Sequence, residues 1–283
     1  YIANSLRQAL SGGHRCDAVS VRWQSLPDMA GYDAVVHCAG IVHRKRVKSA
    51  EYMSVNTDLT IKLAEKAKSQ GVRRFIFMST MAVYGMKDAI GMGGKNKAMI
   101  TRDTVPQTKS WYGRSKLMAE EWLKPLAAPD FRVDILRLPM VYGSGCPGNY
   151  AKLARLARTL PVFPDADNER SMLYIGNLCE FVRLLLKESA RELLNGPAQA
   201  GNYTIYCPQN REYARTTDMV RLLAQKNGKK IAFSKKLGRF ICVLPLNFIK
   251  KLFGNLTYDL YMSAYFDYKY CVKSTEESVE EVI

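Results

Sequence analysis

The first half of the chain alternates short apolar runs with longer segments that carry an amphipathic stripe. Phe75 to Ser79 form an almost continuously apolar run, which is typical of a parallel strand buried on both faces. Similar runs occupy 32–40 and 131–143, and helical stripes fill 54–72 and 111–122 between the runs. The order strand, helix, strand, helix, strand predicts an α/β fold with a doubly wound parallel sheet.

The second half of the chain has a mixed pattern. Residues 144–160 begin as a loop and continue as a helix with one apolar side, and 161–172 contain the proline and aspartate residues of a further loop. Residues 177–188 have the pattern of a helix, which we expect to return to the main sheet, and 201–206 that of a short strand. This half therefore predicts a smaller mixed α and β lobe beside the sheet.

Composition narrows the class of protein without identifying it. The 283 residues are 47% apolar, which suffices for one large core or for one core with a small lobe. The seven cysteines are scattered without a C-x-x-C pair, and the three histidines show no ligand spacing. We therefore expect no disulfide framework, no metal site and a reducing, cytoplasmic location.

The formal net charge of +16 raises the question of an anionic partner. The basic residues are spread along the chain without interleaved aromatic residues, so we expect no nucleic-acid binding. The longest apolar stretch, 240–253, is interrupted by Pro245 and Asn247, and it is too short to span a bilayer. We expect this stretch to pack in the smaller lobe or at a subunit contact, and a weak contact with a membrane surface remains the alternative.

Tyr112 and Lys116 form the most informative pair of side chains. A helix places residues four positions apart on one face, one turn from each other. The lysine ammonium at that distance is expected to favour the phenolate and so to lower the pKa of Tyr112. A tyrosine in that state can exchange a proton with a sugar hydroxyl near neutral pH.

Two hydroxyl side chains end the central apolar run. Ser79 and Thr80 stand at the carboxyl end of the predicted strand, the edge at which open α/β sheets bind ligands. A hydroxyl there can bind a substrate oxygen and share its proton with Tyr112. The alternative is that both side chains satisfy backbone groups where the strand ends.

These residues resemble the extended short-chain dehydrogenase/reductase family, in its NAD-dependent epimerase/dehydratase branch of nucleotide-sugar enzymes. The matching segments, in family order and spacing, are HCAG (37–40), VN (55–56), FMSTMAVYG (77–85), YGRSK (112–116), LRLPMVYG (136–143) and RSMLYIGNL (170–178). The resemblance covers most of the chain. It implies a Rossmann-like fold, NAD as cofactor and an activity like that of UDP-glucose or UDP-N-acetylglucosamine 4-epimerases.

The resemblance also implies roles for individual residues. Thr80, Tyr112 and Lys116 correspond to the catalytic triad, with Tyr112 as the acid and base. The implied cofactor contacts are Ala3, Arg22, His37, Cys38, Ala39, Gly40, Asn56, Ser79 and Lys116. The implied substrate contacts are Thr80, Met140 and Arg170. The guanidinium of Arg170 suits the nucleotide diphosphate that this position contacts in the family.

Three positions depart from the family pattern. The family opens with a strand and a glycine-rich phosphate loop, whereas this chain opens YIANSLRQAL, with Ala3 where the last small residue of the loop belongs. We therefore expect a chain truncated at its N-terminus, which lacks the first strand and the glycine loop. Arg22 ends the predicted second strand, 16–23, where an acidic residue would select NAD, so NADP stays open. Met140 replaces a substrate-binding asparagine of many members.

The resemblance favours C4 epimerisation of a UDP-hexose or UDP-N-acetylhexosamine, with a role in polysaccharide or cell-envelope sugar synthesis. Two alternatives stay open: an NAD(P)H-dependent reductase of a UDP-4-keto-6-deoxy sugar, and a truncated, non-catalytic dinucleotide-binding protein. A homodimer is expected through the helix after Asn56 and the Tyr112 helix. The expected NAD(P)-binding domain is 1–143 with 173–206 returning to it, and the expected substrate lobe is 144–172 with 207–283.

Overall fold

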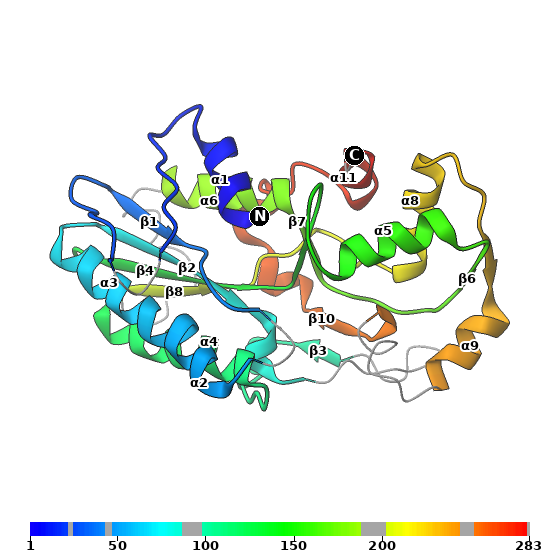
Figure 1. The fold of residues 1–283 in the computed structure, drawn as a ribbon, viewed down its shortest axis with the longest axis horizontal. Coiled ribbons are helices and arrows are strands. Elements are labelled where there is room, and N and C mark those ends of the chain that lie inside the picture. Colours follow the sequence, from blue (N-terminus) through cyan, green and yellow to red (C-terminus); the bar gives the residue numbers. More distant parts are fainter. Residues whose placement is uncertain (22–24, 43–46, 87–97, 188–201, 244–251, 282–283) are drawn as a thin grey trace.

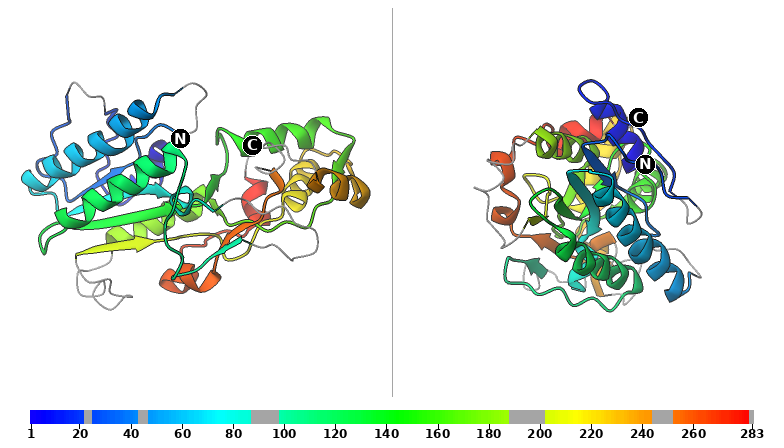
Figure 2. Two further views of the ribbon diagram at one scale, coloured as in Figure 1. Left: turned by 90° about the horizontal axis from the view of Figure 1, so that it is seen from below. Right: turned by 90° about the vertical axis from the view of Figure 1, so that its left-hand side faces the viewer.

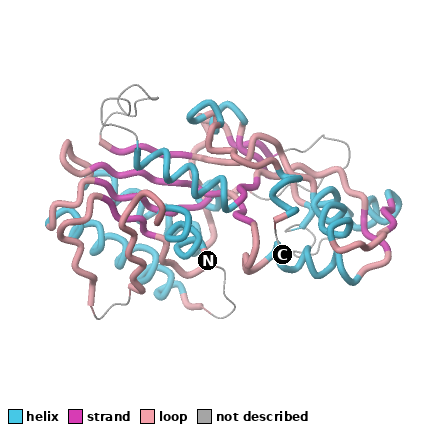
Figure 3. Tube along the Cα trace, turned by 90° about the horizontal axis from the view of Figure 1, so that it is seen from above, coloured by secondary structure: helices cyan, strands magenta, loops and turns pink. Residues whose placement is uncertain are grey.

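The computed structural model describes residues 1–21, 25–42, 47–86, 98–187, 202–243 and 252–281 (Figure 1). The molecule is elongated, with the main sheet and its helices at one end and the smaller lobe at the other (Figure 3). Arg22, one of the expected cofactor contacts, lies outside the described residues.

The main sheet has four parallel strands in the order β1-β2-β4-β8. Their bounds are β1 Ala34–His37, β2 Arg74–Thr80, β4 Arg132–Leu138 and β8 Tyr203–Tyr206. In the register of the central pair, Phe77 lies beside Ile135 and Thr80 beside Leu138, so the carboxyl ends of β2 and β4 form one edge. The expected α/β fold with a doubly wound parallel sheet is confirmed.

Alternate residues of the central strands face two different helix layers. Phe75 and Phe77 pack with α3 (Leu59–Ser69) and α4 (Trp111–Leu123), in a core that includes Leu63 and Leu123. Ile76 and Met78 face the other way, toward α1 (Ile2–Leu10) and α6 (Ile175–Lys187). Because both faces of β2 are covered, its near-continuous apolar sequence is explained by burial.

A π-helical turn interrupts the helix that precedes β2. Helix α2 (Ser49–Met53) runs without a break into the π turn Ser54–Asp58 and then into α3. Helix α3 ends before Gly71, which has a φ of 78°, a conformation that glycine adopts without strain. The π turn directs Asn56 and Thr57 into the protein interior, where both side chains are buried.

The smaller lobe combines short strands with further helices. Its helices are α5 (Asn149–Thr159), α8 (Thr216–Lys226), α9 (Lys235–Val243) and α11 (Thr275–Glu280). Its two-stranded parallel pairs are β5 (Met140–Tyr142) with β7 (Met172–Tyr174), β6 (Val162–Pro164) with β9 (Ala232–Ser234), and β3 (Ala98–Ile100) with β10 (Leu256–Tyr258). Short 3-10 turns lie at Met81–Tyr84, Lys124–Leu126, Leu260–Ser263 and Tyr265–Tyr268.

The two parts of the chain are interleaved. Strand β3 lies inside the segment 1–143 that we assigned to the sheet domain, yet it pairs with β10 near the C-terminus. In the opposite sense, Tyr265 and Tyr270 of the expected substrate lobe pack edge-on against Phe181 of α6, with ring centroids 5.7 and 5.0 Å apart. Strand β8 and helix α6 do belong to the main sheet layers.

Two expected strands differ in the structure. The predicted strand over 16–23 is wrong for its described residues, because 16–21 have no regular secondary structure. A strand needs a neighbour for its backbone hydrogen bonds, and none of the described strands pairs with 16–21. The run 131–143 divides into β4 and β5 at Pro139, since proline has no N–H to donate to a sheet.

Candidate functional site

Helix α4 carries Tyr112 and Lys116, one turn apart. The helix begins after Ser110, whose hydroxyl accepts a hydrogen bond from the backbone N–H of Gly113 at 3.0 Å. The Lys116 side chain is buried and its ammonium donates to the carbonyl oxygen of Met78 at 2.9 Å. The same nitrogen lies 4.5 Å from the ring centroid of Phe77. Lys116 is thus held against the last residues of β2.

Tyr112 and Thr80 are joined by a side-chain hydrogen bond. Thr80 also accepts from the backbone N–H of Ala82 at 3.2 Å, so it caps the short helix after β2 as well. Thr80 thus satisfies a backbone group where β2 ends, and its expected contact with a substrate oxygen stays a prediction. The structure brings Thr80, Tyr112 and Lys116 together at the carboxyl end of β2.

The expected lowering of the Tyr112 pKa by Lys116 is wrong for this structure. Burial raises the pKa of Tyr112, the hydrogen bond from Thr80 opposes that rise, and the nearby Tyr52 adds to it. Burial lowers the pKa of Lys116 to about 8, against the opposing effects of Cys38 and Glu120. The lysine is directed at Met78, and desolvation outweighs its influence on the phenol.

Asn56 joins the segment after β1 to helix α4. Its side-chain oxygen accepts from the backbone N–H of Ile41 at 2.7 Å, and its side-chain nitrogen donates to Ile41 O and to Ser115 Oγ, both at 3.0 Å. Ser115 directly precedes Lys116, and its backbone oxygen accepts from Thr57 at 2.8 Å. Asn56 therefore has a positioning role that the fold explains, because the π turn aims it inward.

Gly40 lies against these groups. A Cβ atom at this position would sit 3.1 Å from Asn56 Oδ1 and 3.2 Å from Lys116 Nζ. Those distances are tighter than ordinary contacts, so a side chain here would press on both groups. The packing of Asn56 and Lys116 therefore explains the glycine, and the expected approach of a ligand to the backbone at Ala39 and Gly40 stays a prediction.

His37 and Cys38 point into the protein. His37 is buried, its Nε2 is 3.0 Å from Thr60 Oγ1, and its ring stacks on Phe77 at 6.0 Å. Burial lowers the pKa of His37 to about 3, with a further contribution from Lys116. Burial raises the pKa of Cys38 to about 12, and the Lys116 charge opposes this. Both pKa shifts favour the neutral side chains, and the expected cofactor contacts of His37 and Cys38 stay a prediction.

A buried ionic network beneath the triad was missed by the sequence reasoning. The Ser79 hydroxyl donates to Glu120 on α4, and Arg137 of β4 donates to the same carboxylate from Nη2 at 2.6 Å and from Nε at 3.1 Å. Arg137 Nη1 donates to Tyr84 OH at 2.9 Å. The signal was present, since Glu120 lies one turn beyond Lys116 and Arg137 interrupts an apolar strand.

The remaining expected site residues lie on other elements than β2 and α4. Ala3 is exposed in the first turn of α1, whose N-terminal backbone N–H groups have no intrahelical partners. Met140 begins β5 and is partly buried. Arg170 lies in the smaller lobe, where its backbone pairs with Ala214 at 3.0 Å.

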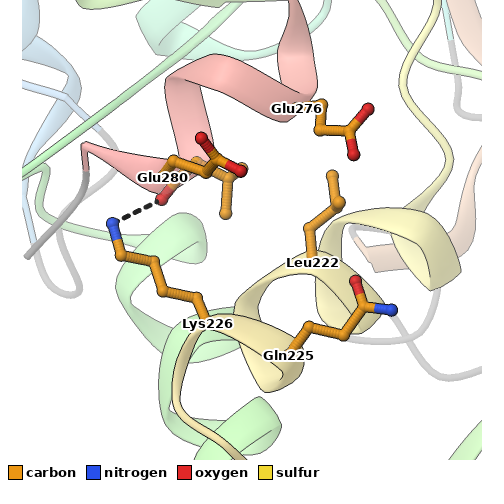
Figure 4. A pocket seen from close by; sticks show the side chains of 6 residues that line it. Leu222, Gln225, Lys226, Glu276 and Glu280 are labelled. Carbon is orange, nitrogen blue, oxygen red and sulfur yellow. Dashed lines mark hydrogen bonds between the residues drawn. The ribbon is translucent and has the colours of Figure 1, made fainter.

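A separate cavity of about 360 Å³ lies between α8 and α11. Its lining residues, drawn in Figure 4, are Leu222, Gln225, Lys226, Glu276, Val279 and Glu280. Lys226 Nζ donates to the carbonyl oxygen of Val279 at 3.1 Å across it. The cavity contains none of the expected site residues, and the chemistry of the triad does not involve it.

Comparison with proteins of known sequence gives relatives that match half of the chain or more. A UDP-glucose 4-epimerase from Vibrio cholerae is 38% identical over 157 residues, 52% of this chain and 46% of that protein. An N-acetyl-α-D-glucosaminyl-diphospho-ditrans,octacis-undecaprenol 4-epimerase from Escherichia coli O157:H7 is 30% identical over 209 residues, 72% of this chain and 57% of that protein. The chain thus spans about half the length of these relatives.

Comparison with solved structures shows the same fold. The complex of MoeE5 with UDP-glucuronic acid and NAD has a TM-score of 0.66 at 19% identity, over 100% of this chain and 94% of that one. UDP-glucuronic acid 4-epimerase from Bacillus cereus in complex with NAD has a TM-score of 0.63 at 19% identity, over 88% and 72% of the two chains. Residues 5–197 match the family model described as NAD dependent epimerase/dehydratase family. The chain therefore belongs to the NAD-dependent epimerase/dehydratase family.

Proposed function

We propose that the protein containing this chain is an NAD-dependent nucleotide-sugar epimerase that inverts C4 of a UDP-hexose or UDP-N-acetylhexosamine. The observation that carries the proposal is that Thr80, Tyr112 and the buried Lys116 come together at the carboxyl end of β2. A phenol, a hydroxyl and an ammonium at one sheet edge can hold a sugar hydroxyl and move its proton.

The residues at this edge fit a nicotinamide dinucleotide. Lys116 makes one hydrogen bond within the described residues, to Met78 O, and an ammonium has three N–H groups. The remaining donors would hold the ribose hydroxyls of the cofactor. The backbone of residues 39–41 would line the cofactor, and the hydrogen bonds of Asn56 to Ile41 would keep that surface rigid.

Tyr112 would act on the C4 hydroxyl of the sugar. Bound NAD would supply the hydride acceptor and donor, and the protein supplies orientation and proton transfer. Thr80 would hold the C4 oxygen by a hydrogen bond while Tyr112 accepts the proton of the C4 hydroxyl. Lys116 would bind the ribose hydroxyls, and the hydrogen bond from Thr80 is the contact that favours the phenolate of Tyr112.

Substrate recognition is proposed for Arg170 and Met140. Arg170 would bind the nucleotide diphosphate, because a guanidinium pairs with phosphate oxygens in a bidentate manner. Met140 offers no amide, so a backbone group would bind the sugar at that position. The Escherichia coli relative is named for a sugar carried on a polyprenyl diphosphate, so a lipid-linked diphosphate sugar is a second substrate form to test.

A homodimer is also proposed. The outer face of α4 exposes Trp111 (49%), Met118 (44%) and Trp122 (56%), which lie about two turns and one turn apart along one side of the helix. Exposed apolar residues of this size mark a contact surface. The partner surface would be the same helix of a second copy, together with α3.

The test is a product assay on the full-length protein. Purified protein is incubated with UDP-glucose or UDP-N-acetylglucosamine and NAD, and the sugar is followed by NMR. The proposal expects the C4 epimer to form with no net change in NADH absorbance. Stoichiometric oxidation of NADPH with a 4-keto sugar would instead establish the reductase alternative, and dinucleotide binding with no turnover of either sugar would establish the non-catalytic one.

A further inference from the structure

Basic side chains gather at the outer end of the smaller lobe. This end consists of the last turns of α5, the strand pair β6 and β9, and α9, which lie together in Figures 1 and 2 at the end away from β1. We name it the basic end, and its exposed or partly exposed cations are Arg155, Arg158, Lys229, Lys230, Lys235, Lys236 and Arg239. Lys229 Nζ donates to the carbonyl oxygen of Arg158 at 2.7 Å. This bond joins the end of α5 to the segment that leads into β9.

Helix α9 presents cations and an aromatic ring on one face. At about 100° per residue, Lys235, Lys236, Arg239 and Phe240 fall within an arc of about 140°. Gly238 lies on the other side, where a Cβ atom would meet the carbonyl oxygen of Asp165 at 2.0 Å, so the helix packs there backbone to backbone. The basic face therefore points away from the protein, and Phe240 is 62% exposed on it.

Few carboxylates oppose this charge. Helices α5 and α9 contain neither Asp nor Glu. In the adjoining loop, Asp165 and Asp167 both form ion pairs with Arg215. Over the described ranges, no cation of the basic end forms an ion pair with a carboxylate. The result is a concentrated positive field on one end of a chain whose net charge is +16.

We infer that the basic end docks the protein on an anionic lipid bilayer through the outer face of α9. A helix face that combines lysine, arginine and an exposed phenylalanine pairs attraction to acidic head groups with shallow insertion of an apolar ring. Val162, 42% exposed on the strand against which α9 packs, adds apolar surface at the same end. A single exposed ring gives no stacking platform for a nucleic acid, so the lipid surface is the better match.

This surface is separate from the triad, so the inference does not depend on the proposed function. None of the described helices has the length and apolar content to cross a bilayer, so the contact would be peripheral. The test is co-sedimentation of the full-length protein with vesicles of 30% phosphatidylglycerol in phosphatidylcholine, at 150 mM salt. We expect binding to these vesicles and none to pure phosphatidylcholine.

Two charge-reversal variants distinguish binding through the α9 face from attraction by the net charge of the protein. Lys235→Glu with Lys236→Glu and Arg239→Glu is expected to weaken vesicle binding at least tenfold, and Phe240→Ala alone about threefold. The matched control reverses three exposed cations elsewhere, Arg7→Glu, Arg102→Glu and Lys109→Glu, and is expected to change binding less than twofold. Circular dichroism and the melting temperature establish that each variant is folded.

Three results would overturn the inference. One is that the unmodified protein stays in the supernatant with the anionic vesicles. A second is that the control triple loses as much binding as the α9 triple, which would make net charge the whole cause. The third is that duplex DNA of 20 base pairs binds the protein and is released by the α9 triple, while the vesicles do not bind.

Discussion

The ammonium of Lys116 lies 2.9 Å from the carbonyl oxygen of Met78, so the charge at the centre of the site is buried and bonded to the backbone of β2. Burial lowers its pKa from 10.5 to about 8. The unfolded chain therefore binds this proton more tightly than the folded one. The folded state carries that penalty below pH 8 and gains stability as the pH rises from about 8 toward 10.5.

Replacing Lys116 removes this pH dependence. Between pH 7 and pH 10.5 the unmodified protein is expected to gain about 3 kcal/mol in its free energy of unfolding from this group, and Lys116→Met is expected to gain none. The stability of Lys116→Met relative to the unmodified protein should therefore fall by that amount over this range. Urea unfolding at both pH values measures it, with the exposed Lys109→Met as the matched control. Parallel pH profiles for Lys116→Met and the unmodified protein would contradict a buried, charged lysine.

His37 makes a contribution of the opposite kind. Burial lowers its pKa to about 3, so as the pH falls below about 6.5 the unfolded chain takes up a proton that the folded chain does not. The stability is fully present above that pH and is lost on acidification. In His37→Gln, we expect the slope of unfolding free energy between pH 6 and pH 4 to decrease by about 1.4 kcal/mol per pH unit. A slope identical to that of the unmodified protein would rule the assignment out.

The ionic network under the triad gives a prediction about stability. Glu120→Gln leaves the buried guanidinium of Arg137 without its counter-charge and is expected to cost about 3–5 kcal/mol. The double variant Glu120→Gln with Arg137→Met is expected to cost less than the single one, since no charge remains buried. The neighbouring Glu121→Gln is the control, because its ion pair with Lys124 is exposed and is expected to be worth under about 1 kcal/mol.

Chemical denaturation of Glu120→Gln, Arg137→Met and the double variant decides this point. A loss in the double variant equal to the sum of the two single losses would mean that the two residues act independently. The account requires strong coupling, because Arg137 reaches Glu120 with two nitrogens and Tyr84 with a third.

Asn56 gives a prediction about the segment after β1. Asn56→Ala removes the partners of both backbone groups of Ile41 and of Ser115, and is expected to destabilise the protein by about 2–4 kcal/mol. Asn56→Asp keeps an acceptor for Ile41 N–H but puts a buried carboxylate oxygen against Ile41 O, so its loss is expected to be at least as large. Hydrogen exchange at the amide of Ile41 measures the local effect directly. Unchanged protection of that amide in Asn56→Ala would contradict the anchoring role.

The strands of the main sheet were predictable because burial on both faces leaves a plain apolar signal. Residues 74–80 show this signal most clearly. The helix that carries Tyr112 and Lys116 could be placed from the four-residue spacing of these two side chains. The end of β4 was not placed correctly, because the apolar pattern continues through Pro139 and only the missing N–H of proline divides it. The predicted strand at 16–23 depended on a pairing partner that a local pattern does not supply.

Side-chain directions were harder to obtain than element positions. The π turn at 54–58 shifts Asn56 toward α4, and the apolar periodicity of a helix does not distinguish such a turn. His37 was expected beside a cofactor, yet its ring stacks on Phe77 because the last residue of β1 faces the α3 layer. The pairing of Glu120 with Arg137 depends on β4 lying next to β2 under α4, which is a property of the assembled sheet.

The central claim is that Tyr112, held by Thr80 beside Lys116, transfers the proton of the sugar C4 hydroxyl. The most direct measurement compares the full-length protein with its Tyr112→Phe variant, by NMR detection of the C4 epimer formed from UDP-glucose or UDP-N-acetylglucosamine. Removing the phenol oxygen is expected to lower the rate at least about a thousandfold while NAD binding persists. Epimer formation at an unchanged rate in the folded Tyr112→Phe variant would contradict the account.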